Sequence, residues 1–128
     1  MKYKLTSNLS KKEVMEVLQN EFQFPFDVTG LEDFNWEEYY VLGPGDSEEY
    51  KKLKNTQPSY KDTFKVLDIK IGFNSEWVID SQDFLAHVQR LSDNKMFYLG
   101  LSEIKALDEN SKNQQLLDDY TEWLYNNL

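Results

Sequence analysis

The chain has 128 residues, a formal net charge of −9 at pH 7 and no cysteine. A chain of this length can bury a sizeable hydrophobic core, so we expect residues 1–128 to form a single domain. The negative charge repels a phosphate backbone and favours cations or basic protein surfaces, so we expect no nucleic-acid partner. The lack of cysteine excludes thiolate catalysis, zinc–thiolate sites and disulfide bonds, and it fits a reducing cytoplasm.

No stretch approaches the roughly 20 apolar residues that a membrane-spanning helix requires, and the first residues lack the apolar region of a signal peptide. We therefore expect a soluble, cytoplasmic protein with no membrane partner. The one histidine, His87, has no second histidine or cysteine to act with, so we interpret it as a packing residue. No phosphate-binding glycine loop is present and no pair of acids is singled out for hydrolysis. The sequence thus predicts no enzymatic activity.

The first predicted element is a helix from Ser10 to about Phe22. Ser10 and Glu13 have the spacing of a capping box, in which each side chain accepts a hydrogen bond from the other residue's backbone N–H. Apolar residues recur at helical spacing on one side, which predicts a packing helix. These residues are Val14, Val17, Leu18 and Phe22.

The segment that follows is rich in aromatic residues. Pro25 disfavours a helix and cannot donate within a sheet, so residues 22–26 are predicted to be an edge strand or an ordered extended entry. Asn35 to Leu42 is a second strand candidate. Residues 43–46 predict a turn, and residues 47–55 predict a short surface helix or loop.

The centre of the chain predicts further strands. Thr63 to Phe73 alternates, and its predicted core face carries Lys65, Leu67, Ile69, Ile71 and Phe73. Residues 76–79 are a candidate for a short strand, and residues 80–83 are predicted to form a turn. Two extended runs, residues 84–91 and 95–101, are separated by a short polar turn, which predicts a hairpin.

The last predicted element is an amphipathic helix that begins near Ser111. Ser111 and Gln114 again have the capping-box spacing. The predicted buried face consists of Leu116, Leu117, Tyr120, Trp123 and Leu124. The elements together predict an α+β fold, with a small antiparallel sheet or an SH3-like partial barrel flanked by N-terminal and C-terminal helices.

The last third of the chain, residues 85–124, contains a strand pair, a corner with leucine and serine, an acidic stretch and a helix that ends in Asp-Tyr-x-x-Trp. This third resembles a family of small acidic bacterial proteins, the CcbP-like calcium-binding proteins. The matching residues are Leu101, Ser102, Ile104, Leu107, Asp108, Ser111, Leu117, Asp119, Tyr120 and Trp123. The resemblance covers about a third of the chain and implies a cytoplasmic protein that binds Ca²⁺ through surface carboxylates without catalysis.

Calcium takes about six to eight oxygen ligands, so carboxylate clusters are its candidate sites. An EF-hand loop starting at Asp108 is excluded because Lys112 would occupy a ligand position. We expect the ligands in two acidic clusters, which would converge if residues 35–50 formed a strand and returned. The two clusters are Glu32, Asp33, Glu37 and Glu38, and Asp46, Glu48 and Glu49.

Other acids remain open as weaker candidates. They are Asp80 with Asp83, Asp108 with Glu109, and Asp118, Asp119 and Glu122. Each acidic run has an ordinary alternative explanation, since in a chain of this charge it can simply be a solvated face.

A different class of function also fits the composition. An acidic inhibitor or immunity-like protein could cover a basic protein surface, possibly by mimicking the charge of a nucleic acid. Aromatic residues interleaved with acids suit such an interface, although the same residues suit a core. These aromatic residues are Trp36, Tyr39, Tyr40 and Tyr50.

Overall fold

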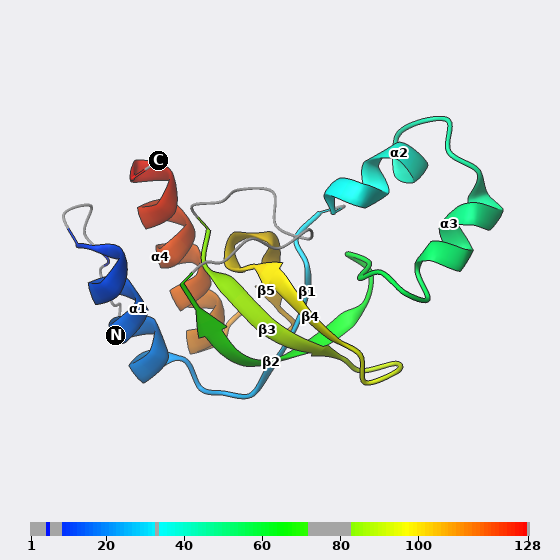
Figure 1. Ribbon diagram of the computed structural model, residues 1–128. Coiled ribbons are helices and arrows are strands. Elements are labelled where there is room, and N and C mark those ends of the chain that lie inside the picture. Colours follow the sequence, from blue (N-terminus) through cyan, green and yellow to red (C-terminus); the bar gives the residue numbers. More distant parts are fainter. Residues whose placement is uncertain (1–4, 6–8, 33, 72–82, 128) are drawn as a thin grey trace.

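The computed structural model describes residues 5, 9–32, 34–71 and 83–127. Figure 1 shows the elements in chain order. They are α1 (Lys11–Glu21), β1 (Phe26–Gly30), η1 (Asn35–Glu37), α2 (Glu38–Val41), α3 (Ser47–Leu53), β2 (Thr63–Lys70), β3 (Leu85–Arg90), β4 (Met96–Gly100), η2 (Leu101–Glu103), β5 (Ile104–Ala106) and α4 (Lys112–Asn126).

The strands of the described residues form one open antiparallel sheet in the order β4-β3-β2-β1-β5. Helices α1 and α4 contact each other and pack on the sheet. Residues 34–62 extend outward from the end of the sheet where β1 ends and β2 begins (Figure 1). We call residues 34–62 the arm, and the sheet with α1 and α4 the body. The predicted α+β class, a small antiparallel sheet between N-terminal and C-terminal helices, is confirmed.

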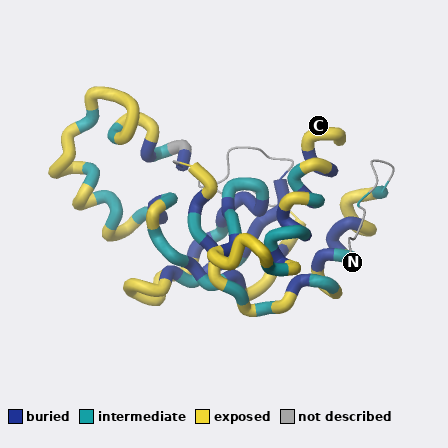
Figure 2. Tube along the Cα trace, turned by 180° about the vertical axis from the view of Figure 1, so that it is seen from behind, coloured by how far each residue is buried: buried dark blue, intermediate teal, exposed yellow. Residues whose placement is uncertain are grey.

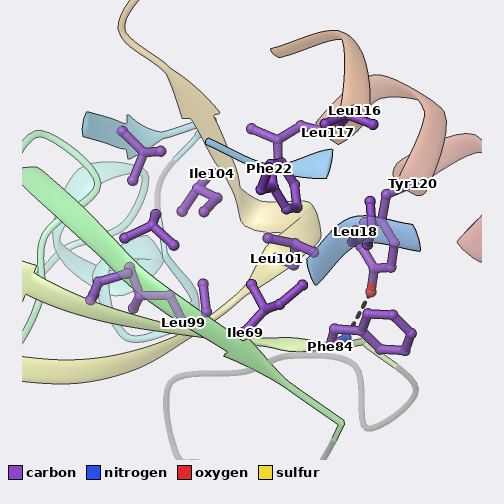
Figure 3. Close-up of a cluster of buried hydrophobic side chains, with 14 of the residues drawn as sticks. Leu18, Phe22, Ile69, Phe84, Leu99, Leu101, Ile104, Leu116, Leu117 and Tyr120 are labelled. Carbon is purple, nitrogen blue, oxygen red and sulfur yellow. Dashed lines mark hydrogen bonds between the residues drawn. The ribbon is translucent and has the colours of Figure 1, made fainter. Parts of the chain in front are cut away.

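The hydrophobic core lies between the sheet and the two terminal helices (Figure 3). Leu18 of α1, Phe64 of β2, Val88 of β3 and Leu116 of α4 are fully buried there. Burying one such side chain contributes about 1.5–3 kcal/mol relative to leaving it in water. Figure 2 shows that the buried residues gather in the body, while the arm is mostly exposed.

Both terminal helices begin where the capping residues predict. The Ser10 and Glu13 side chains exchange the two hydrogen bonds of a capping box at 3.1 and 3.2 Å. Ser111 accepts from the Gln114 N–H at 3.1 Å, but the Gln114 side chain instead accepts from the Ala106 N–H at 2.7 Å. Gln114 therefore ties α4 to β5 rather than closing a capping box. The predicted buried face of α4 is confirmed.

The strand predicted for residues 35–42 is wrong, because this segment forms η1 and α2. The alternation does not produce one buried side, because Glu37 is fully buried and Trp36 packs against the core while Tyr39 is exposed. The short helix predicted as one alternative for residues 47–55 is confirmed as α3. Asp46 caps this helix by accepting from the Glu48 N–H at 3.0 Å.

The predicted core face of β2 is wrong except at Ile69, and Phe73 lies outside the described residues. Phe64 and Val66 are buried while Leu67 is exposed, and the pairing with β3 shifts register between Val66 and Asp68. In a regular strand Phe64 and Ile69 would face opposite sides, because an odd number of positions separates them. The irregularity between them interrupts the alternation, so both face the core. The strand ends at Lys70, and Ile71 is exposed.

The predicted hairpin is confirmed as β3 and β4. Residues 22–26 form the extended entry to β1, which lies inside the sheet between β2 and β5 rather than at an edge. Pro25 precedes the strand and takes no place in the ladder. The strand candidate at residues 76–79 and the turn at residues 80–82 lie outside the described residues. No helix within the described ranges is long and apolar enough to cross a membrane.

Candidate metal centre

Asp83 stands just before β3, with its side chain buried. Its carboxylate accepts from the Ser102 hydroxyl at 2.6 Å and from the Ser102 N–H at 3.2 Å. The Tyr120 hydroxyl of α4 also donates to Asp83, and it accepts from the Phe84 N–H at 2.7 Å (Figure 3). Asp83 therefore joins the start of β3, η2 and α4 at one end of the sheet.

A second carboxylate approaches Asp83 beside Gly100, the last residue of β4. A Cβ atom at Gly100 would collide with Oε2 of Glu103 and would lie 2.5 Å from Oδ2 of Asp83. Both oxygens thus point to the same spot against the Gly100 backbone, an approach that only glycine permits. We call this place the Asp83–Glu103 corner. Two carboxylates held this close repel each other, and either a cation between them or a proton on one of them relieves the repulsion.

Glu37, one of the predicted metal ligands, is fully buried and is not a surface carboxylate. Its oxygens accept from the Tyr50 hydroxyl at 2.5 Å, the Ser59 hydroxyl at 2.7 Å and the Tyr60 N–H at 2.7 Å. The Phe34 N–H is a weaker fourth donor at 3.4 Å. Glu37 therefore organises the inside of the arm, and its lone pairs are taken by the protein itself.

The other predicted ligands are spread over the arm and the segment before it. Five of them are exposed and Asp33 lies outside the described residues. Because residues 35–50 form short helices, the strand return that would bring the two clusters together does not exist. Glu49 accepts from the Tyr40 hydroxyl at 2.7 Å. The five exposed carboxylates are Glu32, Glu38, Asp46, Glu48 and Glu49.

Within the ranges that the structure describes, no group of three or more His, Cys, Asp or Glu side chains is arranged to hold a metal ion. A cation in this part of the molecule would therefore take at most a pair of carboxylates, together with backbone carbonyls and water. The Asp83–Glu103 corner is such a pair, drawn from two different elements.

The acids of the arm act on its tyrosines. The hydrogen bond to Glu49 is the main cause that raises the pKa of Tyr40 to about 12. Burial, together with the hydrogen bond to Glu37, raises the pKa of Tyr50 well above its usual value. Both hydroxyls thus remain protonated donors through the physiological range, which keeps the carboxylates of Glu37 and Glu49 in use as acceptors.

From the sequence, Asp83 is predicted to lie in a turn with Asp80, and Glu103 is not among the predicted ligands. Asp80 lies outside the described residues. One signal could have pointed to Glu103, because a glycine that ends a strand often marks the close approach of another group. Gly100 is such a glycine, and Glu103 follows it by a single turn of 3₁₀ helix.

The fold places the chain in the α+β class with an open antiparallel sheet and terminal helices. No protein-family model matches the chain, and no curated protein matches it. Among solved structures, the crystal structure of Anabaena CcbP is similar, with a TM-score of 0.54 and 18% sequence identity over 91% of this chain and 78% of that chain. At this identity the likeness is one of fold. Its extent corrects the expectation that the resemblance is confined to the last third.

Proposed function

We propose that this chain is a calcium-binding protein that acts as a weak buffer or sensor and performs no catalysis. The observation that carries the proposal is the approach of the Asp83 and Glu103 carboxylates to one spot beside Gly100. Calcium is a hard cation that prefers carboxylate, carbonyl and water oxygens. At this corner the carboxylates would supply the negative charge, and carbonyls and water would complete the shell.

Two further facts support a cation as the ligand. The net charge of −9 raises the concentration of cations around the whole molecule. The fold resembles that of CcbP, and the last third carries the residues by which the sequence resembles CcbP-like calcium-binding proteins. Because two carboxylates give a modest charge at the site, we expect a Kd on the order of 10⁻⁴ M.

Calcium titration of the ¹⁵N-labelled protein tests the proposal. We expect saturable amide shifts centred on residues 100–104, with much smaller shifts for magnesium, which accepts irregular coordination less readily. Glu103→Gln removes one charged ligand from a half-buried position and should lower the affinity for calcium at least about tenfold. Glu48→Gln removes the same charge from an exposed site on α3 and should change the affinity less than about twofold.

The outcomes separate the possible sites. Loss of affinity in Glu48→Gln but not in Glu103→Gln would move the site to the arm carboxylates. Absence of any calcium-specific shift at about ten times the expected Kd would overturn calcium binding itself. Asp83→Asn separates the possible sites less well, because Asp83 accepts from Ser102 and Tyr120 and the substitution would also disturb the fold.

A second candidate function is recognition of a basic protein surface by the arm. The observation that favours it is the exposure of Tyr39 and Leu42, 57% and 77% exposed, between the exposed carboxylates of Glu38 and Asp46. Protein interfaces combine an aromatic or apolar centre with a polar rim, and an acidic rim attracts a basic partner.

Affinity capture from the source cells tests this second function. We expect the wild-type protein to retain a basic protein that moderate salt releases, and the Tyr39→Ser/Leu42→Ser variant to lose it. Leu107→Ser removes an exposed apolar side chain from the body and is the control. Retention of the same proteins by all three forms would contradict an interface on the arm.

A further inference from the structure

A basic pocket lies where the arm joins the β3–β4 hairpin, on a protein whose net charge is −9. The pocket has a volume of about 440 Å³, within the range of small-ligand sites. Four cationic side chains and two carboxylates line it. They are Lys51, Lys54, Lys61, Arg90, Asp62 and Asp93.

Arg90 forms the buried part of the pocket wall and is 2% exposed. Its guanidinium pairs with Asp93 at 2.8 Å and Asp62 at 3.0 Å. It also donates to the carbonyls of Lys54, Gln57 and Asn55 at 2.8–3.0 Å. Arg90 pairs with both carboxylates but offsets the charge of only one, so the four cations and two carboxylates leave a surplus of two positive charges in the pocket. Arg90 also fixes the backbone from which Lys54 projects.

The three lysines keep a surplus of positive charge. No carboxylate lies within salt-bridge distance of Lys54 or Lys61 in the part of the chain that the structure describes. Their ammonium groups instead lie over aromatic rings, 4.5 Å from the centre of Tyr50 and 5.6 Å from the centre of Tyr60. Lys51 has only a 3.9 Å contact with Glu48, and exposed ion pairs of this kind contribute little stabilisation.

We propose that this pocket binds a small anion with phosphate or carboxylate groups through Lys51, Lys54 and Lys61. Lysine is a common point-charge ligand for phosphate, and the cation–π contacts limit where two of the ammonium groups can lie. Ser92 and Asn55 add neutral polar groups to the wall. The site is distinct from the Asp83–Glu103 corner and does not depend on calcium.

The surrounding charge restricts the size of the ligand. Helix α3 carries Glu48 and Glu49 in the first turn and Lys51 and Lys52 in the last. A long polyanion such as a nucleic acid would have to lie across these acids and the rest of a negatively charged surface, which repels it. A small anion occupies only the basic end of the helix and the pocket.

Amide chemical shifts test the pocket. The ¹⁵N-labelled protein is first passed over a chelating resin to remove calcium. It is then titrated with inorganic phosphate or with citrate, and chloride keeps the ionic strength constant. We expect saturable shifts confined to residues 51–62 and 90–95 for at least one of these anions. The anion that saturates at the lower concentration identifies phosphate or carboxylate as the preferred chemistry.

Two charge variants measure the role of the lysines. Lys54→Gln/Lys61→Gln should lower the affinity for the preferred anion about tenfold, since each exposed charge pair changes an affinity by about two- to fivefold. Lys51→Gln/Lys61→Gln keeps the contact of Lys54 with Tyr50 and should lower the affinity for the anion by a similar factor. This second variant tests the lysines even if the first variant has a folding defect.

The control removes equal charge elsewhere. Lys12→Gln/Lys105→Gln alters residues of α1 and β5, and should leave the affinity unchanged within about twofold. Shifts that never saturate, or a control variant that loses as much affinity as the pocket variants, would overturn the proposal in favour of nonspecific ion binding. Because calcium is removed before the titration, neither result depends on whether the protein binds calcium.

Discussion

In the body, the largest buried side chains are mainly apolar and come from the sheet and both terminal helices, whereas neither α2 nor α3 in the arm contains a buried residue. The arm instead surrounds one fully buried carboxylate, Glu37, with donors from α3 and from residues 59 and 60. Its aromatic rings form a small cluster, in which Tyr40 stacks on Tyr50 at 5.5 Å.

This difference predicts two levels of stability in one chain. Apolar burial in the body is shared by many side chains and should be lost cooperatively, all at once. The arm depends on a few directed polar contacts, each of which contributes only a small net free energy. The arm should therefore open more readily than the body, and single polar substitutions should affect it locally.

The largest expected effect is a core truncation in the body. Phe64→Ala should lower the free energy of unfolding by about 3–5 kcal/mol, because it removes buried apolar surface and leaves a cavity. Urea denaturation measures the loss, and the amide signals of the body should follow one transition. Leu67→Ala, on the exposed side of the same strand, should cost much less. Equal losses for the two variants would mean that the register shift in β2 is wrong.

The next effect concerns the contact between the body and the arm. Arg90→Met should lower the free energy of unfolding by about 3 kcal/mol, because it leaves two carboxylates and three carbonyls without their buried cation. Hydrogen exchange should speed up most at residues 54–62. The control is Lys95→Met, which removes a more exposed cation that bonds to one of the same carbonyls at 2.6 Å. A similar loss of unfolding free energy for Lys95→Met would contradict the prediction that Arg90 is the main contact between the arm and the body.

A smaller and more local effect is expected inside the arm. Glu37→Gln keeps the shape but replaces one acceptor oxygen by an NH₂ group that faces donors, so the cost should be about 2 kcal/mol. Amide exchange should rise in residues 34–60 and stay unchanged in α4. Glu38→Gln, at an exposed neighbouring position, is the control. Faster exchange across the whole sheet would show that the arm and the body unfold together.

The contrast between the two regions also decides what the sequence could predict. In the body, the apolar spacing of α1 and α4, the cap residues Ser10 and Ser111 and the polar turn of the hairpin predicted elements that the structure contains. These signals are local, so they can be read from short windows. The face of β2 was missed because a register shift is set by the partner strand rather than by the strand's own residues.

In the arm and at the candidate site, the decisive contacts join residues far apart in the chain. Glu37 receives its donors from residues 50, 59 and 60, so nothing near Glu37 distinguishes it from the exposed Glu38. Asp83 and Glu103 come from opposite ends of the β3–β4 hairpin and meet only because the strands pair. Acidic composition could predict that carboxylates matter, but it could not choose among them.

The smallest expected effect is the pH dependence of the contact between Arg90 and Asp93. The hydrogen bonds from Arg90 are the main cause that lowers the pKa of Asp93 from 3.8 to about 2. Because the folded-state pKa lies below that of the unfolded chain, the contact stabilises the fold above about pH 4 and is lost as the pH falls through about 2. Solvent screening limits the contribution to about 1 kcal/mol, since the Asp93 side chain is 32% exposed. Asp93→Asn should therefore be less stable than wild type by about this amount at pH 6, and the difference in urea denaturation should shrink between pH 4 and pH 2. A difference that stays constant over this range would mean that Asp93 acts through its shape and its hydrogen bond to the Lys95 N–H rather than through its charge.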